Sequence, residues 1–437
     1  MSKSIFFITV LFIFPTLIKT QKIYIIDSQA RPGFNFKDLQ KAVSTVPSGS
    51  YLFVRDGLYS PFSVSGKVLH IRGSGSAPIG AKNSNIKSVY GGPLHTVISN
   101  VPAGGTFVIE GFFFSSGYTL FGQTPSAPAL ILEKGNFYLH DLVIFATGGK
   151  GAKSAEFRNA KVFAKNVNIT GMAYMVSMFK YSAPPDGLYI SNTKLSMCDS
   201  VLSVWPSSSQ YSYNGGVALE VTSSSFVDIF KTTIGGGIGK GGKGGNGIEL
   251  LAGSRLLADG SYIEGGQAGS SFSQSGYGIF IGANSSASIA GSLVLGGWDS
   301  TKTSRGPAFG GSGACKNRSN YSYRPHLEIK KIKAHPDSYD LVLSGPPNKA
   351  LFLVIGIESG WDSIGTTNIP GILFIKPGCL LFQILPPVFL PGSGKTTIHI
   401  PIIPGKNVEG PLFIQSFMFP INAQTIGSNL ALISVWP

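Results

Sequence analysis

Glu220 and Glu249 have the residue type and spacing that acid–base chemistry needs. Each follows an apolar residue in the same way, within VALEV at residues 217–221 and GIELL at residues 247–251. If these segments are strands stacked in register, the two side chains lie about 4.8 Å apart. Glycoside hydrolysis with retention uses two carboxyl groups about 5–5.5 Å apart. The pair is therefore a candidate acid and base.

The same spacing extends the pair into an outward-facing column. Counting back by one copy of the repeat gives Tyr189, and a further copy gives Arg158, whereas counting forward gives Phe280. Aromatic faces pack against sugar rings, and carboxylates accept hydrogen bonds from sugar hydroxyls. The glycan-binding candidates are therefore Tyr189, Glu220, Glu249 and Phe280. The alternative is a purely structural pattern, because outward positions of any stacked β-structure are polar or aromatic.

We expect no glycan cleavage to depend on Glu220 or Glu249. Two exposed carboxylates lack the burial or the strongly coupled neighbour that raises the pKa of a general acid. Neither a histidine nor an arginine is clearly placed to assist them, since Arg158 lies two copies of the repeat away. The substitution Glu249→Gln is accordingly expected to leave the fold and its stability nearly unchanged.

The column depends on a repeat that occupies much of the chain. Residues 217–237, 246–266 and 277–297 each contain a short apolar strand, a Ser/Gly corner, a second alternating strand, one aliphatic residue and a Gly pair. The aliphatic residues are Ile234, Ile263 and Val294, and weaker copies are anchored at Ile144, Ile169 and Leu202. No helical periodicity lies between these strands, which excludes βαβ units. A period of this kind predicts a right-handed parallel β-helix.

A second column lies three residues before each anchor. Its members are Asp141, Asn166, Asp199, Lys231, Gly260 and Gly291. Asp, Asn and Gly tolerate left-handed backbone geometry, so the column predicts a turn at one corner of every coil. A calcium site is the alternative interpretation.

The stretch at residues 51–75 contains a strand, the sequence Asp56-Gly57-Leu58-Tyr59, a second strand and VLHIRGSG. With residues 105–120 and 128–144, it resembles the opening coils of the pectin-lyase-like superfamily of right-handed β-helices, over about residues 22–300. In the lyase branch this resemblance implies a calcium cofactor held by clustered carboxylates, and we find no three that the register brings together. In the polygalacturonase branch it implies adjacent aspartates and a histidine. No Asp-Asp pair occurs, and His140 is the only coil histidine after position 95. We therefore expect no metal or other cofactor, apart from calcium if the protein is a lyase.

The two ends of the chain differ from the repeat. Residues 1–20 read as a secretory signal with a poor cleavage site, and an uncleaved N-terminal anchor is the alternative. No later stretch is long and apolar enough to span a membrane.

We expect Asn35 to cap a short helix that covers the first coil, with Leu39 and Val43 on its buried face. The prediction is thus an all-β chain: a β-helix with an N-terminal capping helix at 21–304, a linker at 305–325 and a β-sandwich at 326–437. The last segment resembles a domain found in many secreted bacterial proteins.

The net charge of +14 predicts a surface that attracts polyanions. For a secreted or cell-surface protein these are acidic polysaccharides or components of the cell envelope. Nucleic acid is not expected, because the charges are dispersed and no nucleic-acid-binding fold is visible. Three cysteines are too few for a disulfide framework. We expect Cys198 to be buried, and Cys315 and Cys379 could form one bridge.

The sequence therefore favours a secreted, non-catalytic structural or binding protein that contacts polysaccharide. The alternative is a carbohydrate-active enzyme of the pectin-lyase-like superfamily, either a polysaccharide lyase or a glycoside hydrolase. A dense acidic cleft would distinguish the two.

Overall fold

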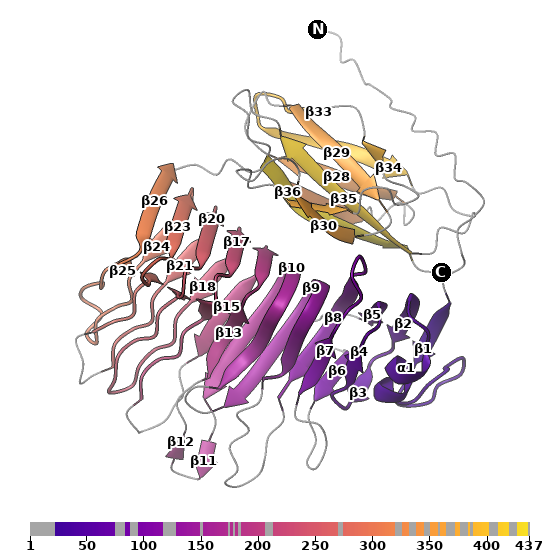
Figure 1. Cartoon of the computed structure of the whole chain (residues 1–437), viewed down its shortest axis with the longest axis horizontal. Coiled ribbons are helices and arrows are strands. Elements are labelled where there is room, and N and C mark those ends of the chain that lie inside the picture. The colour runs from indigo at the N-terminus through magenta and orange to yellow at the C-terminus, as the bar shows by residue number, and fades with distance from the viewer. Residues whose placement is uncertain are drawn as a thin grey trace.

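The chain forms a β-solenoid followed by antiparallel sheets (Figure 1). The computed structural model describes residues 22–74, 84–87, 95–116, 128–148, 152–173, 175–177, 180–181, 185–205, 213–269 and 274–319 of the solenoid region. In the C-terminal part it describes residues 326–331, 338–344, 350–356, 359–363, 372–375, 383–384, 388–401, 410–418 and 426–435. The expected signal at 1–20 lies outside these residues. No helix within them is long and apolar enough to cross a membrane.

The solenoid has three faces, and each face is a parallel sheet with one strand from each coil. The first face contains β4 (Ser63–Ser65), β7 (Thr96–Ser99), β13 (Asp186–Ser191), β16 (Leu219–Thr222), β19 (Ile248–Leu250), β22 (Ile279–Ile281) and β25 (Phe309–Gly311). The second contains β1 (Ile23–Ile26), β2 (Ser50–Val54), β5 (Leu69–Gly73), β14 (Lys194–Cys198), β17 (Phe226–Phe230), β20 (Arg255–Asp259), β23 (Ser286–Ala290) and β26 (Ala314–Ser319). The third contains β3 (Gly57–Tyr59), β6 (Ser84–Lys87), β15 (Val201–Trp205), β18 (Thr233–Gly235), β21 (Tyr262–Glu264) and β24 (Leu293–Leu295).

Three long strands bend around the corners and belong to more than one face. They are β8 (Phe107–Ser115), β9 (Leu130–Gly148) and β10 (Lys153–Ala173), and each pairs in parallel with the next. A short antiparallel hairpin of β11 (Met175–Ser177) and β12 (Lys180–Tyr181) follows them. This uninterrupted parallel pairing confirms the parallel β-helix that the repeat predicts.

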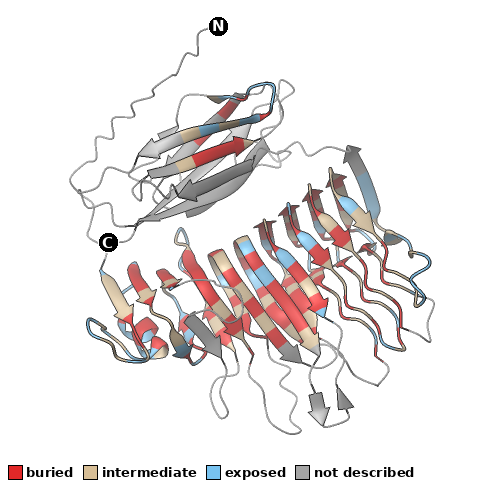
Figure 2. Ribbon diagram, turned by 180° about the vertical axis from the view of Figure 1, so that it is seen from behind, coloured by how far each residue is buried: buried red, intermediate tan, exposed pale blue. Residues whose placement is uncertain are grey.

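The core is a stack of aliphatic residues inside the three faces, and it confirms the anchors read from the sequence. Ile144, Ile169, Leu202, Ile234, Ile263 and Val294 pair one after another across the third face. All except Val294, in the last of these coils, are completely buried. Along strands such as β7, β16 and β21, buried residues alternate with more exposed ones (Figure 2), as a parallel sheet with one face on a core requires.

The predicted turn column is also confirmed. Asp141, Asn166, Asp199, Lys231, Gly260 and Gly291 all have positive φ, between 46° and 55°. The Asn166 side chain donates to Asp141 Oδ1 at 2.6 Å, so neighbouring coils are tied together at this corner. The column therefore has the structural role that Asn, Asp and Gly perform in tight turns.

Helix α1 (Leu39–Thr45) lies at the first coil and buries Leu39, Ala42 and Val43. Its N-cap is Asp38, whose side chain accepts from the Lys41 amide at 2.6 Å, so the expectation that Asn35 caps the helix is wrong. Asn35 instead accepts a bond of 2.7 Å from the Ile25 amide, and this bond ties the preceding loop to β1. A carboxylate at the N-cap also suits the helix dipole.

The last coil extends further than the sequence suggested. Strands β25 and β26 pair with β22 and β23, although their residues fall in the segment expected to be a linker. Glycines and the exposed Cys315 obscure the strand pattern there. Cys198 is buried, as expected, whereas Cys379 lies outside the described residues.

The C-terminal strands pair in antiparallel fashion. One sheet contains β27 (His326–Lys331), β28 (Ser338–Ser344) and β34 (Lys395–Pro401). Another contains β29 (Ala350–Gly356), β32 (Gln383–Ile384), β33 (Val388–Phe389), β35 (Gly410–Met418) and β36 (Ile426–Val435), and β30 (Ser359–Ser363) pairs with β31 (Ile372–Ile375). Strand β27 also contacts β36 of the other sheet. That this segment is a separately folding sandwich remains a prediction.

Candidate functional site

The outward column of the first face contains four of the five residues predicted for it. Strand pairing places Tyr189 beside Glu220, Glu220 beside Glu249, and Glu249 beside Phe280. Their neighbours Leu219, Ile248 and Ile279 point into the core and are completely buried. All four column residues are partly exposed. We name this row, with Glu156 at its start, the first-face column.

Arg158 is not a member of this column, which corrects the expectation from the sequence. Glu156 pairs with Tyr189, whereas Arg158 pairs with Ser191 two positions along the strand. Arg158 still contacts the column, because its guanidinium group donates to the Glu156 carboxylate. The coil that joins Glu156 to Tyr189 is longer than the later copies, so counting back by the later spacing gives the wrong residue.

Lys153 is the residue at this site that sequence reasoning missed. Its ammonium group lies 2.6 Å from Asp186 Oδ2 and also bonds the carboxylate of Glu220. The Lys153 Nζ atom lies 5.4 Å from the centre of the Tyr189 ring. Burial alone would lower the pKa of Lys153, but Asp186 and Glu220 outweigh it and raise that pKa. The register pairs Lys153 with Asp186, so the strands themselves hold this ion pair in place.

Glu249 differs from its neighbour Glu220. Its Oε1 atom accepts a bond of 2.6 Å from the Asn246 side chain. Burial raises the pKa of Glu249, and the nearby carboxylates of Glu220 and Asp186 add to this effect. The expectation of two equivalent carboxylates exposed to water is therefore wrong, because one is bound by a lysine and the other is half-buried beside a neutral amide.

Loops rich in glycine border the column. Each runs outward from the third face and returns to the first face, and they form the extended traces below β18, β21 and β24 in Figure 1. Their backbones bond in a single row in which each amide donates to the preceding carbonyl: Gly216, Gly237, Gly245, Gly266, Gly276, Gly297 and Gly306. We name this row the glycine row. It holds Asn246 and Tyr277 at the edge of the column, where the Tyr277 and Phe280 ring centres lie 5.9 Å apart.

The second face carries another polar group that the sequence did not reveal. His70 Nε2 lies 3.2 Å from Glu110 Oε2, and Arg72 Nε lies 2.9 Å from Glu110 Oε1. Burial would raise the pKa of Glu110, but His70 and Arg72 lower it to about 2. His140 pairs with Glu110 on the next coil, and burial lowers the pKa of His140.

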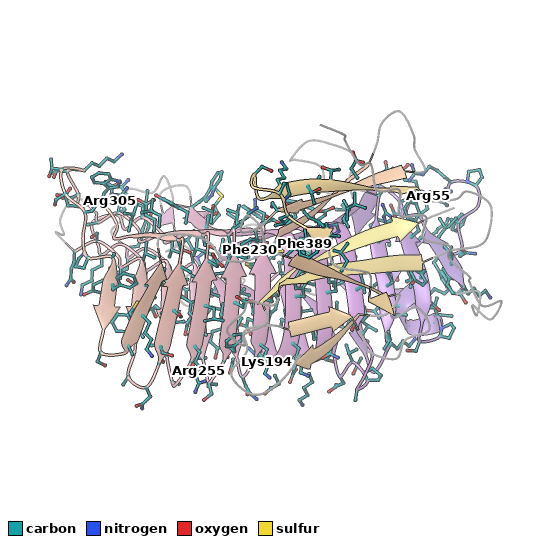
Figure 3. All side chains as sticks on the ribbon, turned by 90° about the horizontal axis from the view of Figure 1, so that it is seen from above. Arg55, Lys194, Phe230, Arg255, Arg305 and Phe389 are labelled. Atoms are coloured by element: carbon teal, nitrogen blue, oxygen red, sulfur yellow. The ribbon has the colours of Figure 1, made fainter. Side chains whose placement is uncertain are left out.

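These side chains point away from the core, yet His70, Glu110 and the neighbouring Tyr138 are buried. Figure 3 looks down on the second face, and the C-terminal strands lie over its purple half; Figure 1 shows the same strands directly above it. The group is therefore part of a covered surface, and the first-face column is the more accessible candidate. Among the described residues of the whole chain, no three His, Cys, Asp or Glu side chains meet as a metal site would require.

The chain matches no family model and no curated protein. Among solved structures it is similar to an alginate lyase from Paenibacillus, with 13% sequence identity and a TM-score of 0.35, over 64% of this chain and 96% of that one. It is also similar to a pectate lyase, with 13% identity and a TM-score of 0.29, over 70% of this chain and 80% of that one. A third likeness is to the enzymatically active domain of a tailspike protein of bacteriophage CBA120, with 9% identity and a TM-score of 0.25, over 91% of this chain and 65% of that one. Likenesses this distant carry no argument about activity.

Proposed function

We propose that this chain is a secreted or cell-surface protein whose first-face column binds a polysaccharide without cleaving it. One observation carries the proposal: the parallel register places Tyr189, Glu220, Glu249 and Phe280 on consecutive coils. The two rings lie at the ends of the row, and the two glutamates lie between them. An extended glycan that crosses the coils would meet a ring, two hydrogen-bond acceptors and a second ring in turn.

The rings give the binding test. We expect Tyr189→Ala and Phe280→Ala each to weaken binding of a glycan identified on an array by about tenfold, because each removes an aromatic contact of about 1.4 kcal/mol. Binding is measured by calorimetry on the full chain, after its unfolding temperature has been checked.

Trp205→Ala is the matched control. Trp205 is 56% exposed on β15 of the third face, away from the column. If Trp205→Ala weakens glycan binding as much as the two column variants do, or if the column variants do not weaken it, the column is not the binding site.

Glycoside hydrolysis is the second candidate function, and the contrast between Glu249 and Glu220 favours it. Burial raises the pKa of Glu249, as a general acid requires, whereas the Glu220 carboxylate is bound by Lys153. Glu249 would give its proton to the glycosidic oxygen, while the Glu220 carboxylate attacks the anomeric carbon or activates the water that does so. The departing chain leaves with the proton, and water completes the cleavage.

If the protein does hydrolyse a glycan, Glu249→Gln is expected to abolish the release of reducing ends and to leave binding intact. The wild-type rate should fall as the pH rises through the raised pKa of Glu249, since the acid must be protonated. Glu133→Gln, at a partly exposed glutamate of β9 outside the column, is the control. If the wild-type protein releases reducing ends from none of the polysaccharides tested, glycoside hydrolysis is ruled out and the non-catalytic binding function stands.

A further inference from the structure

The only lysine that contacts the column in the described part of the chain is already neutralised. Lys153 is bound by two carboxylates, from Asp186 and Glu220, and only 16% of its side chain is exposed. Asp186 is fixed in turn, because its other oxygen accepts a bond of 2.7 Å from the Val217 amide. Lys153 is therefore held in a pair of bonds that a ligand would have to break before it could use the charge.

The remaining charges on the column are negative or paired. Arg158 is bound to Glu156. Glu249 is held by the neutral side chain of Asn246. The charge of the first-face column is therefore opposite in sign to the net charge of +14 for the whole chain. A sugar carboxylate on this face would meet carboxylates without a free cation, whereas a sugar hydroxyl would meet good acceptors.

We propose that the first-face column selects neutral polysaccharides over polyuronates, and that Asp186 and Glu220 set this specificity by holding Lys153. The inference rests on the proposed binding function of the column. Acidic and neutral polysaccharides would then bind to different parts of the surface. Polyanions attach weakly to the positive surface elsewhere, and a neutral glycan occupies the column.

The test compares oligomers of one length: β-1,4-linked glucose or mannose against galacturonic or mannuronic acid. The wild-type chain is expected to bind a neutral oligomer at least about tenfold more tightly than either uronate oligomer, a difference of about 1.4 kcal/mol. Binding of the neutral oligomer should persist in 1 M salt, where the screening length is about 3 Å. Any binding of a uronate oligomer should be lost in 1 M salt. At low salt, that binding should be the same in Tyr189→Ala as in the wild-type chain.

The decisive variant is Asp186→Asn combined with Glu220→Gln, which releases the ammonium group of Lys153 and keeps the shape of both side chains. Uronate affinity is expected to rise by about fivefold in this double variant, as one ion pair forms with the freed lysine. Adding Lys153→Met should remove the gain, and circular dichroism checks that each variant is folded.

The outcomes distinguish the specificity from the function beneath it. If the wild-type chain prefers a uronate and loses that binding in Tyr189→Ala, the specificity is wrong and the binding function stands. If the double variant gains no uronate affinity, Asp186 and Glu220 do not set the specificity. If no oligomer of either kind binds, the proposed function itself fails.

Discussion

Replacing Ile263 with alanine is expected to lower the free energy of unfolding by about 2–5 kcal/mol. Ile263 is completely buried on β21, and its strand lies between the strands of Ile234 and Val294. Neighbouring coils are fixed by parallel pairing on three faces, so they cannot collapse into the space left by the lost carbons. Chemical denaturation of the wild-type and variant chains, followed by circular dichroism, measures the difference.

Val294→Ala gives the matched comparison in the next coil. Val294 is only partly buried, and it would lose fewer buried carbon atoms than Ile263. We expect a cost well below that of Ile263→Ala. Equal costs at the two positions would mean that the stack is not packed as its register implies.

Gly266→Ala is expected to have the other large effect, a loss of stability of about 3 kcal/mol or more, as overpacking against a rigid neighbour produces. A Cβ atom on Gly266 would overlap the carbonyl oxygen of Gly237 in the preceding loop. That oxygen belongs to the backbone of the glycine row and accepts the Gly245 amide at 2.8 Å, so it cannot move aside cheaply. Thermal unfolding measures the loss.

Gly235→Ala controls for the substitution itself. Gly235 lies at the end of β18, and a Cβ atom there would meet nothing within 4 Å. Its backbone is not in the left-handed region, so alanine fits without strain. A variant as unstable as Gly266→Ala would show that loss of a glycine, and not contact between loops, causes the effect.

The stacking of the solenoid could be predicted from the sequence because it depends on spacing alone. Once Ile234, Ile263 and Val294 are aligned, the fixed alternation of a strand assigns the outward positions of Glu220 and Glu249. The corner residues follow for a similar reason, since a left-handed turn restricts the residue types that fit. Both predictions use only local geometry repeated from coil to coil.

The chemistry of the column could not be read in this way. Lys153 meets Glu220 across 67 positions of sequence, and nothing in the repeat connects them. The burial of Glu249 depends on how the glycine loops lie beside the first face. The error at Arg158 has the same origin, because one longer coil shifts the count by two residues. Likewise, no pattern of residues indicates that a covered surface lies on the outside of the second face.

The glycine row also bears on how the solenoid can lengthen or shorten during evolution. Each loop contributes two consecutive members: Gly237 and Gly245 come from one loop, and Gly266 and Gly276 come from the next. Duplication of a whole coil would therefore interrupt one bond of the row and insert two glycines. These two would bond each other and would offer one amide and one carbonyl to the groups on either side, so that no backbone group is left unpaired. Deletion of one arm of a loop would leave an amide facing a carbonyl that is no longer there. Gene duplication in whole repeats is thus the change that this architecture tolerates best.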